Sequence, residues 1–371
     1  MTGGGTAGHI NPALAIADII KQNDPGSVIE FVGTTRGKET ELVLREGYRL
    51  HFVEIRGIKR SLSPANLVTA WYVLTAPHKA EKLIREFKPD IVIGTGGYAC
   101  WPTLKAASKL GIPTMVHESN ALPGIAVRKL QNQVDKILIN FEETRSKLSA
   151  PAEKIVRVGN PLRGGFGHIT QQDAKSKLKI DRYKYFVMSV GGSLGAEVIN
   201  ENALKFMVEC ADSHPEILYM HAAGVRYYSE MAAKLREVGL DNAPNIILCD
   251  YIHDMPLRMA AADLVISRSG AMTISELALM KKAAILVPSP NVVDNHQYKN
   301  AKVLADAGAA VLLEEVEMVG NNRICELILE LLSTPARRAS LSVRIGNFAD
   351  SDANRLVYEE ITKLLNQKTS K

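Results

Sequence analysis

The strongest constraint on the fold is a recurring unit in which an apolar run leads into a glycine-containing turn and then a helix-forming stretch. The clearest copy has the apolar run 264–266, the turn Ser267–Gly270, a run of helix formers, and a further apolar run at 284–287. This order of strand, turn, helix and strand is typical of parallel α/β sheets. Because Gly270 allows a sharp turn, the next helix presents backbone N–H groups to a negatively charged ligand.

Three further glycine loops have a similar context. They are Gly3–Gly8, Gly94–Tyr98 after the run 90–93, and Gly191–Ala196 after the run 185–190. The loops Gly3–Gly8 and Gly191–Ala196 each begin one of two similarly built halves of the chain. We therefore predict two Rossmann-like, doubly wound α/β domains that face a cleft. The chain of 371 residues is long enough for both. We place the boundary near Pro161, with a first domain of 1–160, a second of 161–344, and a C-terminal helix within 345–371 that packs back onto the first domain.

The first loop fits the pattern G-x-G-x-x-G, which is typical of a dinucleotide site. Two observations oppose that interpretation. The next predicted strand, 28–32, ends without an acidic residue to bind a ribose, and only Met1 and Thr2 precede the glycines. Two residues are too few for the strand that launches such a loop. We therefore expect no dinucleotide here and a first sheet that lacks its leading strand.

Two side chains near these loops are candidates for chemistry. His9 begins the helix after the first loop, where it is either a capping or core histidine, or a base or phosphate ligand. Glu276 lies in the first turns of the helix after Gly270, and a carboxylate there can accept hydrogen bonds from two vicinal hydroxyls, such as those of a ribose. The alternative is a strand–helix crossover with polar caps. Tyr251-Ile252 and Asn295–Gln297 follow strands at the edge where open α/β sheets bind ligands.

Two other motifs compete with a phosphate-binding function. Gly191–Gly195 fits G-x-S-x-G, the nucleophile elbow of serine hydrolases, and Asp263 and His296 follow in the matching chain order. A hydrolase, however, leaves the other glycine loops without a function, whereas phosphate contacts explain all of them. Asp350-Ser351-Asp352 is a D-x-D motif, but it precedes a predicted helix and follows no strand, which favours an N-cap. We predict no metal site.

Composition narrows the possible partners. The net charge of +5, from 45 basic and 40 acidic residues, is too mild to indicate nucleic acid but suits phosphorylated ligands or an anionic membrane surface. Four scattered cysteines without a C-x-x-C pair indicate a reducing compartment and no zinc site. We expect no signal peptide, since Met1 leads straight into glycines, and no apolar run reaches the roughly 20 residues of a spanning helix.

Residues 56–88 form an amphipathic segment with apolar residues at helical spacing between basic ones. The apolar set is Leu67, Trp71 and Leu74, and the flanking basic set is Lys59, Arg60, Lys79, Lys82 and Arg85. A core-facing helix with a solvated face is one interpretation. The other is a membrane-surface patch with an apolar wedge and a basic rim.

Seven motifs, in order along nearly the whole chain, resemble the peptidoglycan N-acetylglucosaminyltransferases (MurG), a family with the two-domain GT-B fold. The motifs are GGGTAGHINPALA from Gly3, GTGGY from Gly94, HESN from His117, VGNPLR from Val158, GGSLGA from Gly191, SRSGAMTISE from Ser267 and NHQYKNA from Asn295. Each motif is weak alone, but the ordered set is specific. One departure from many relatives is Ala7, where they have glycine.

The resemblance implies an enzyme that transfers N-acetylglucosamine from UDP-N-acetylglucosamine to undecaprenyl-diphospho-N-acetylmuramoyl-pentapeptide (lipid I). The product is lipid II, formed with inversion at the anomeric carbon and without a cofactor. It also implies a peripheral protein on the cytoplasmic face of the bacterial plasma membrane, with the anionic membrane surface and other cell-wall synthesis proteins as partners and no nucleic acid. The acceptor is a membrane lipid, which favours the membrane interpretation of the segment around Trp71.

The resemblance assigns the donor to residues of both domains. The Ile252 backbone resembles the uracil contact, Glu276 the ribose ligand and Gln297 the contact to the sugar hydroxyls. The diphosphate contacts are Arg163, Ser193 and the helix start, and the full helix segment of the donor site is Ala271, Met272, Thr273, Ile274, Ser275 and Glu276. From the first domain, the donor site includes Asn120 and the loop residues Thr6, Ala7 and Gly8.

On the acceptor side, the resemblance places His9, Gly97 and Tyr98 against lipid I. Attack by the acceptor hydroxyl requires a base, and His9 is the candidate because imidazole titrates near operating pH. It can instead hold the acceptor diphosphate. Arg163, Ser193 and a helix dipole can stabilise the leaving UDP without a metal. Two other classes stay open: a different GT-B enzyme (a lipid glycosyltransferase or a UDP-N-acetylglucosamine epimerase), and a non-catalytic nucleotide-sugar binding protein.

Overall fold

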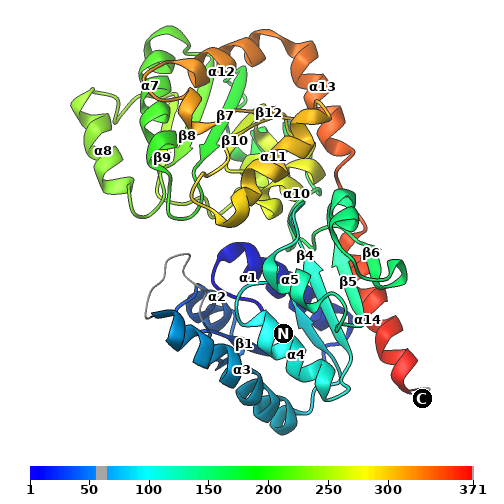
Figure 1. Ribbon diagram of the computed structural model, residues 1–371. Helices are drawn as coiled ribbons and strands as arrows, with labels where there is room; N and C mark the ends of the chain where they lie inside the picture. The colour runs from blue at the N-terminus through cyan, green and yellow to red at the C-terminus, as the bar shows by residue number, and fades with distance from the viewer. Residues whose placement is uncertain (56–64, 370–371) are drawn as a thin grey trace. The chain divides into compact units, whose positions relative to one another are not determined.

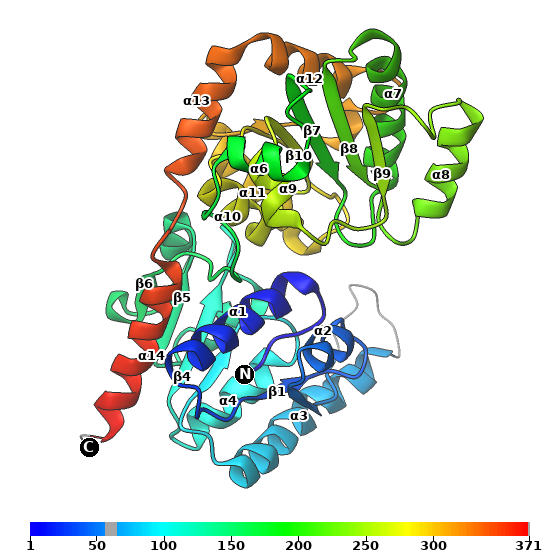
Figure 2. The same cartoon turned by 180° about the vertical axis from the view of Figure 1, so that it is seen from behind.

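The computed structural model describes residues 1–55 and 65–369, which divide into two compact units. The first comprises Met1–Arg163 and Asp350–Lys371, and the second comprises Gly164–Ala349. The chain thus leaves the first unit at Arg163 and returns to it at Asp350, against predicted boundaries at 160 and 345. Figures 1 and 2 show each unit as a parallel sheet between helices.

The sheet of the first unit has two parts, both made of parallel pairs. One part has the order β1-β2 and the other β3-β4-β5-β6. The strands are β1 (Glu30–Gly33), β2 (Arg49–Phe52), β3 (Val92–Gly94), β4 (Thr114–Glu118), β5 (Lys136–Ile139) and β6 (Ile155–Arg157).

Met1 and Thr2 join these two parts, because they occupy the strand position between β1 and β3. Thr2 N donates to Ile93 O (2.8 Å), Thr95 N donates to Thr2 O (2.9 Å), and Val32 N donates to Met1 O (2.9 Å). The leading strand that we expected to be missing is thus reduced to a two-residue bridge. Since the strands that follow Met1-Thr2 and β3 run to opposite sides, this position is a topological switch point, where open α/β sheets bind ligands.

Helices cover both faces of this sheet, and the strand residues alternate between them. Val116 and Ile137 pack with α3 and α4, whereas Met115 and Leu138 pack with α1 and α14. The C-terminal helix α14 lies beside α1 in both views (Figures 1 and 2). The helices are α1 (Ala7–Asn23), α2 (Glu39–Arg45), α3 (Ala65–Phe87), α4 (Cys100–Lys109), α5 (Ile125–Leu130) and α14 (Ala353–Thr369), with short 3-10 turns η1 (Glu142–Lys147) and η2 (Ala152–Lys154).

The second unit has one parallel sheet of order β12-β11-β10-β7-β8-β9, which reverses its winding between β7 and β10. Its strands are β7 (Tyr185–Val190), β8 (Ile217–Ala222), β9 (Ile246–Cys249), β10 (Leu264–Ser267), β11 (Ala284–Leu286) and β12 (Val311–Leu312). Its helices are α6 (Gln171–Leu178), α7 (Glu197–Ser213), α8 (Tyr228–Glu237), α9 (Met255–Ala261), α10 (Ala271–Leu279), α11 (His296–Asp306), α12 (Arg323–Ser333) and α13 (Pro335–Gly346), with 3-10 turns η3 (Val293–Asn295) and η4 (Glu315–Glu317).

The main core of the second unit forms where α7 and α12 pack on one face of the sheet. Val187, Tyr219 and Ile266 from three strands meet Phe206 of α7 and Leu331 of α12 there. The intervening strand residues point to the other face and are buried as well, so both faces are covered, as in other parallel sheets. Within the described part of the chain, no helix has the length and apolar character needed to cross a membrane.

Candidate functional site

In the first unit, the switch point brings two glycine loops together around His9. The loop Gly3–Gly8 follows Thr2, and the loop after β3 begins at Thr95, whose hydroxyl donates to His9 O at 2.6 Å. A Cβ on Gly96 would lie only 2.7 Å from His9 Cδ2, so the imidazole packs directly on that glycine. A Cβ on Gly97 would overlap the Gly4 backbone, and its φ of +83° also favours glycine. The two loops that carry His9 and Gly97, residues assigned to the acceptor, therefore pack against each other.

The half-buried imidazole of His9 has a defined tautomer. Its Nδ1 lies 3.2 Å from Gly4 O, and a carbonyl oxygen only accepts, so Nδ1 carries the proton. The Thr6 hydroxyl is 3.5 Å from the same nitrogen. In the neutral ring, Nε2 is then the basic nitrogen. This is the tautomer that a general base needs when its reacting nitrogen is Nε2.

Asn120 and Tyr98 follow the carboxyl ends of β4 and β3, two neighbouring strands of the same sheet. Asn120 is held by the buried Glu118, whose Oε1 accepts from Asn120 N (2.9 Å) and Asn120 Nδ2 (3.1 Å). Burial raises the pKa of Glu118, and these hydrogen bonds lower it. His117 donates from Nε2 to Gly159 O at 2.9 Å, and burial lowers its pKa to about 4, so it is neutral. Tyr98 is exposed, as are Thr6 and Gly8.

In the second unit, the switch point lies between β7 and β10, and both strands end in the predicted loops. The loop Gly191–Ala196 leads into α7, and exposed Ser193 lies in it. The turn after β10 leads to Gly270, which is the N-cap of α10 and has no side chain to cap that helix. The N-terminus of α10 at Ala271 therefore points its dipole toward the carboxyl edge of the sheet, which suits a diphosphate.

Among the predicted donor residues, Glu276 is a carboxylic acid with a strongly raised pKa. Its side chain is half-buried on α10, and desolvation raises its pKa to about 8. No hydrogen bond to its carboxylate occurs from the described residues. Two ribose hydroxyls would supply donors there and would favour the ionised form.

Two further predicted donor residues, Ile252 and Gln297, lie at the same sheet edge. Ile252 is buried after β9. Gln297 lies in the first turn of α11, where its Oε1 accepts from Ser289 N (2.8 Å) and its backbone carbonyl accepts from the Ser269 hydroxyl (2.9 Å). The contact predicted between Gln297 and the sugar hydroxyls must therefore be made by its side-chain NH₂ group.

A buried polar chain supports the second glycine loop from behind. The Tyr219 hydroxyl donates to Ser189 Oγ (2.7 Å), and Ser189 donates to His221 Nδ1 (2.7 Å). His221 Nε2 then donates to Asn200 Oδ1 (3.0 Å), and Asn200 Nδ2 donates to Ala223 O (3.1 Å). Burial lowers the pKa of His221 to about 3, so the ring is neutral and this direction of donation is fixed. The chain ties β7, β8 and α7 together.

The geometry excludes the serine-hydrolase interpretation. In the pairing of β10 with β7, Leu264 lies opposite Val187 and Ser267 opposite Val190. Ser193 therefore follows the carboxyl end of one strand, whereas Asp263 precedes the amino end of its neighbour, about 10 Å or more away at 3.3 Å per residue.

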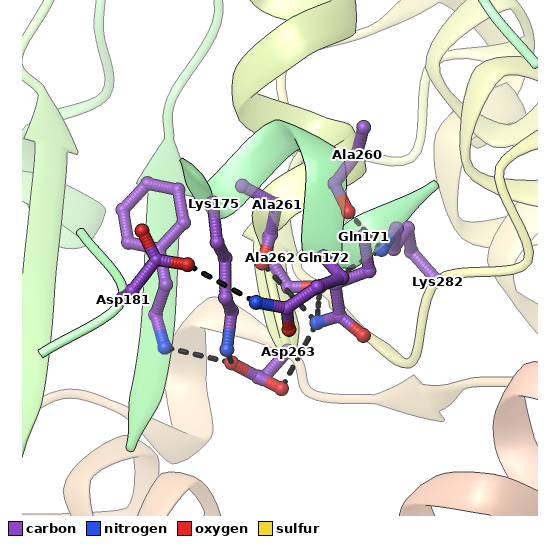
Figure 3. Close-up of polar contacts among 10 residues, drawn as sticks. Gln171, Gln172, Lys175, Asp181, Ala260, Ala261, Ala262, Asp263 and Lys282 are labelled. Atoms are coloured by element: carbon purple, nitrogen blue, oxygen red, sulfur yellow. Dashed lines mark hydrogen bonds and ion pairs between the residues drawn. The ribbon is translucent and has the colours of Figure 1, made fainter. Parts of the chain in front are cut away.

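Asp263 is also fully engaged in a structural cluster (Figure 3). It accepts from Lys175 Nζ (2.8 Å), Phe186 N (2.8 Å) and Gln171 Nε2 (3.0 Å). In the same cluster Lys282 Nζ donates to Ala260 O and Ala262 O, and burial lowers its pKa to about 8. These contacts fasten α6 to the end of α9 rather than activate a nucleophile.

Comparison with known proteins identifies the family. The family models "Glycosyltransferase family 28 N-terminal domain" and "Glycosyltransferase family 28 C-terminal domain" match residues 1–139 and 186–356. A curated protein of Acetivibrio thermocellus is 39% identical over 370 residues, covering 100% of this chain and 99% of its own. That relative is named "UDP-N-acetylglucosamine--N-acetylmuramyl-(pentapeptide) pyrophosphoryl-undecaprenol N-acetylglucosamine transferase". The chain belongs to the MurG family of glycosyltransferases.

Solved structures agree with this family and confirm the predicted GT-B fold. Acinetobacter baumannii MurG has 28% sequence identity and a TM-score of 0.76, with 98% of each chain covered. A UDP-GlcNAc 2-epimerase from Neisseria meningitidis has 16% identity and a TM-score of 0.64, covering 96% of this chain and 98% of that one. The second likeness shows the shared fold alone.

For a MurG family member, Arg163 has an unexpected environment. We predicted a diphosphate contact, but in the structure Arg163 Nε donates to Asp18 (2.7 Å), and its two terminal nitrogens donate to Glu46 (2.9 and 2.8 Å). The guanidinium lowers the pKa of Glu46. The diphosphate contact therefore stays a prediction that requires Arg163 to exchange these carboxylates for a phosphate.

The D-x-D motif is engaged in ion pairs beside α14. Asp350 lies 3.5 Å from Arg157, and Asp352 lies 3.0 Å from Arg355. In the described ranges 1–55 and 65–369, no cluster of three His, Cys, Asp or Glu side chains is arranged to hold a metal ion.

The predicted membrane segment is described only in part. Lys59 and Arg60 lie outside the described residues, as does the side chain of Leu67. Trp71 and Leu74 are exposed on α3, at 65% and 68%. Two of the basic residues that follow form ion pairs within the helix, Lys82 with Glu86 and Arg85 with Glu81. The described part of α3 thus presents an apolar pair beside a face of mixed charge.

Two groups that lie behind the glycine loops were not predicted from the sequence. One is the His221 chain, whose members are scattered over three elements. The other is Glu39, the fully buried first residue of α2, which lies against the first glycine loop. Three glycines near Glu39 were the only available signal.

Proposed function

We propose that this protein transfers N-acetylglucosamine from UDP-N-acetylglucosamine to undecaprenyl-diphospho-N-acetylmuramoyl-pentapeptide, which gives lipid II with inversion at the anomeric carbon. The observation that carries the proposal is the full-length 39% identity to a curated transferase of that name. Its support in the structure is a glycine loop at each switch point, one beside an imidazole and the other beside a helix N-terminus.

The second domain binds the donor in this proposal. Glu276 accepts the ribose hydroxyls, the Ile252 backbone contacts the uracil, and the diphosphate lies at the loop of Ser193 and the start of α10. These groups stabilise the negative charge on UDP as the bond from the sugar to the diphosphate breaks. Gln297 donates to the sugar hydroxyls.

The first domain binds the acceptor and supplies the base. His9 Nε2 takes the proton of the acceptor hydroxyl while that oxygen attacks the anomeric carbon from the face opposite UDP. The new bond forms as UDP leaves with the electron pair, so one attack inverts the configuration. Gly97 and Tyr98 contact the acceptor, and Asn120 and the loop 6–8 extend to the donor sugar.

Release of UDP tests this proposal. Purified protein is incubated with UDP-N-acetylglucosamine, with and without a short-chain lipid I analogue. We expect UDP and a disaccharide product only when the acceptor is present. Conversion of the sugar nucleotide without acceptor would indicate an epimerase, and donor binding without turnover would indicate a non-catalytic binding protein.

Donor affinity is expected to rise with pH through the titration of Glu276. The ribose hydroxyls donate to the ionised carboxylate, and the free group has a pKa of about 8. Below that pKa the carboxyl must lose a proton before it accepts both hydroxyls, so UDP affinity should increase about tenfold per unit from pH 6 to the pKa and then level off. Isothermal titration of UDP between pH 6 and 9 measures this. Glu276→Gln should bind weakly at every pH, and a wild-type profile that is flat over this range would contradict the assignment.

We propose that α3 attaches the protein to the cytoplasmic face of the plasma membrane, where a lipid-linked acceptor lies. Replacement of both Trp71 and Leu74 by Gln should lower binding to anionic phospholipid vesicles about tenfold or more, because two exposed apolar side chains no longer enter the interface. Vesicle sedimentation measures the bound fraction. Gln at Val316 and Val319, which are equally exposed in the second domain, is the matched control. Equal binding by both double variants would refute the role of α3.

A further inference from the structure

The buried carboxylate of Glu39 lies in a cradle of three glycines from separate segments. Glu39 begins α2 and has no exposed surface. A Cβ on Gly4 or Gly33 would lie 2.6 Å from a Glu39 side-chain atom, and a Cβ on Gly37 would overlap the carboxylate. All three positions therefore require glycine while the carboxylate stays in place.

This carboxylate accepts hydrogen bonds from the first glycine loop and from the residue that follows β1. Its Oε2 accepts from Gly5 N at 2.8 Å, and its Oε1 accepts from Thr34 N (2.7 Å) and from the Thr34 hydroxyl (2.8 Å). Within the first loop, the N–H of Gly5 is thus bound by an internal carboxylate.

Glu39 and His9 bind opposite sides of the same peptide group. The N–H of Gly5 donates to Glu39, and the carbonyl of that peptide belongs to Gly4, which accepts from His9 Nδ1 at 3.2 Å. In a trans peptide the N–H and C=O point in opposite directions, so fixing one fixes the other. A charged acceptor on the N–H also polarises the carbonyl and strengthens its bond to the imidazole.

We propose that Glu39 is a positioning residue that acts on His9 through the Gly4–Gly5 peptide. Its carboxylate sets the plane of that peptide, and the carbonyl then holds His9 with Nδ1 protonated and Nε2 basic. The consequence for catalysis rests on the proposed function, in which His9 is the base. The link between Glu39 and the His9 tautomer does not depend on that function.

The test compares Glu39→Gln with Glu41→Gln. Glu41 lies in the same first turn of α2, with its side chain 65% exposed in an ion pair with Lys38, so it controls for loss of a charge at this helix start. Glutamine at 39 cannot accept at both ends, because its NH₂ must face either Gly5 N–H or Thr34 N–H. We expect kcat to fall about tenfold to a hundredfold, as when one charge-assisted hydrogen bond is lost, with the UDP dissociation constant unchanged.

The second readout is the tautomer of His9, followed by nitrogen NMR of the imidazole with His9→Ala for assignment. In the wild type and Glu41→Gln, we expect the proton on Nδ1, and in Glu39→Gln a shift of population toward the Nε2–H form. An unchanged tautomer in a folded Glu39→Gln variant would overturn the proposal, whatever the rate. If the wild type does not transfer sugar, the proposed function fails, but the tautomer result still decides the role of Glu39.

Glu39→Asp covers the case in which Glu39→Gln does not fold. Aspartate keeps the charge at the start of α2 but withdraws the carboxylate by one methylene from Gly5 N. We expect the same tautomer shift and a lower kcat, again with UDP affinity retained. Wild-type kcat and an unshifted His9 in this variant would also overturn the proposal.

Discussion

Replacement of His9 by alanine is expected to lower kcat about 100- to 10,000-fold, the range contributed by a general base. The variant has no nitrogen to take the proton from the acceptor hydroxyl. The two glycines beside the ring, Gly4 and Gly96, have no side chain to fill the space that the imidazole leaves. UDP affinity should stay near the wild-type value, because His9 is not among the residues assigned to the uracil, ribose or diphosphate. Steady-state kinetics with a lipid I analogue, together with titration of UDP, measures both quantities.

His168→Ala is the matched control, since His168 is exposed in the segment before α6. Its kcat should equal that of the wild type. The pattern of the His9→Ala loss also separates the two roles open to this residue. A loss in kcat supports the base, whereas a higher KM for the acceptor with unchanged kcat would mean that His9 binds the acceptor diphosphate instead.

The second large effect is expected from Gly195→Ala, which should abolish measurable UDP binding and destabilise the second domain by several kcal/mol. Gly195 has a φ of +83° and packs against the backbone of Ala223 and Gly224, so a Cβ there would overlap the Ala223 carbonyl. Neither side can yield easily, because both contacts are backbone. The variant must move the loop that contains Ser193, at a cost of about 2–4 kcal/mol from strain and overlap together. Urea denaturation and UDP titration measure the two losses.

Gly192→Ala separates the two sources of that loss. Gly192 lies in the same loop with a φ of +95°, but no atom lies within 4 Å of its Cβ position. This variant has the conformational strain without the overlap, and we expect a loss of about 1 kcal/mol. Equal destabilisation by both variants would contradict the cost assigned to overlap with the Ala223 carbonyl.

The features predicted correctly from the sequence are those that local pattern determines. The apolar runs before Gly94, Gly191 and Gly270 became β3, β7 and β10, because a short apolar run followed by glycine and helix formers has few other structures available. Parallel pairing then brought the loops at their carboxyl ends to the sheet edge. The loops that contain His9 and Gly97 pack against each other for this reason, although 88 positions separate the two residues in the sequence.

What could not be predicted depends on contacts between distant segments. The carboxylate of Glu39 is surrounded by glycines at positions 4, 33 and 37. No pattern in the neighbouring sequence indicates that an acidic residue at the start of a helix is fully buried. The pairing of Arg163 with Asp18 and Glu46 likewise joins three elements. The role of Met1 and Thr2 depended on two flanking strands that supply the hydrogen bonds of the bridge. The serine-hydrolase interpretation was excluded by the register of β10 against β7, which places Ser193 and Asp263 at opposite ends of their strands. That register cannot be read from the sequence.

The most direct test of the central claim is the structure of the product formed from UDP-N-acetylglucosamine and a lipid I analogue. We predict one disaccharide per UDP released, with the transferred sugar attached to the N-acetylmuramoyl residue and its anomeric configuration inverted. Proton NMR of the isolated product gives the linkage and the configuration together. A product with retained configuration would contradict single attack by an acceptor activated at His9, and a modified sugar nucleotide with no disaccharide would contradict the transferase itself.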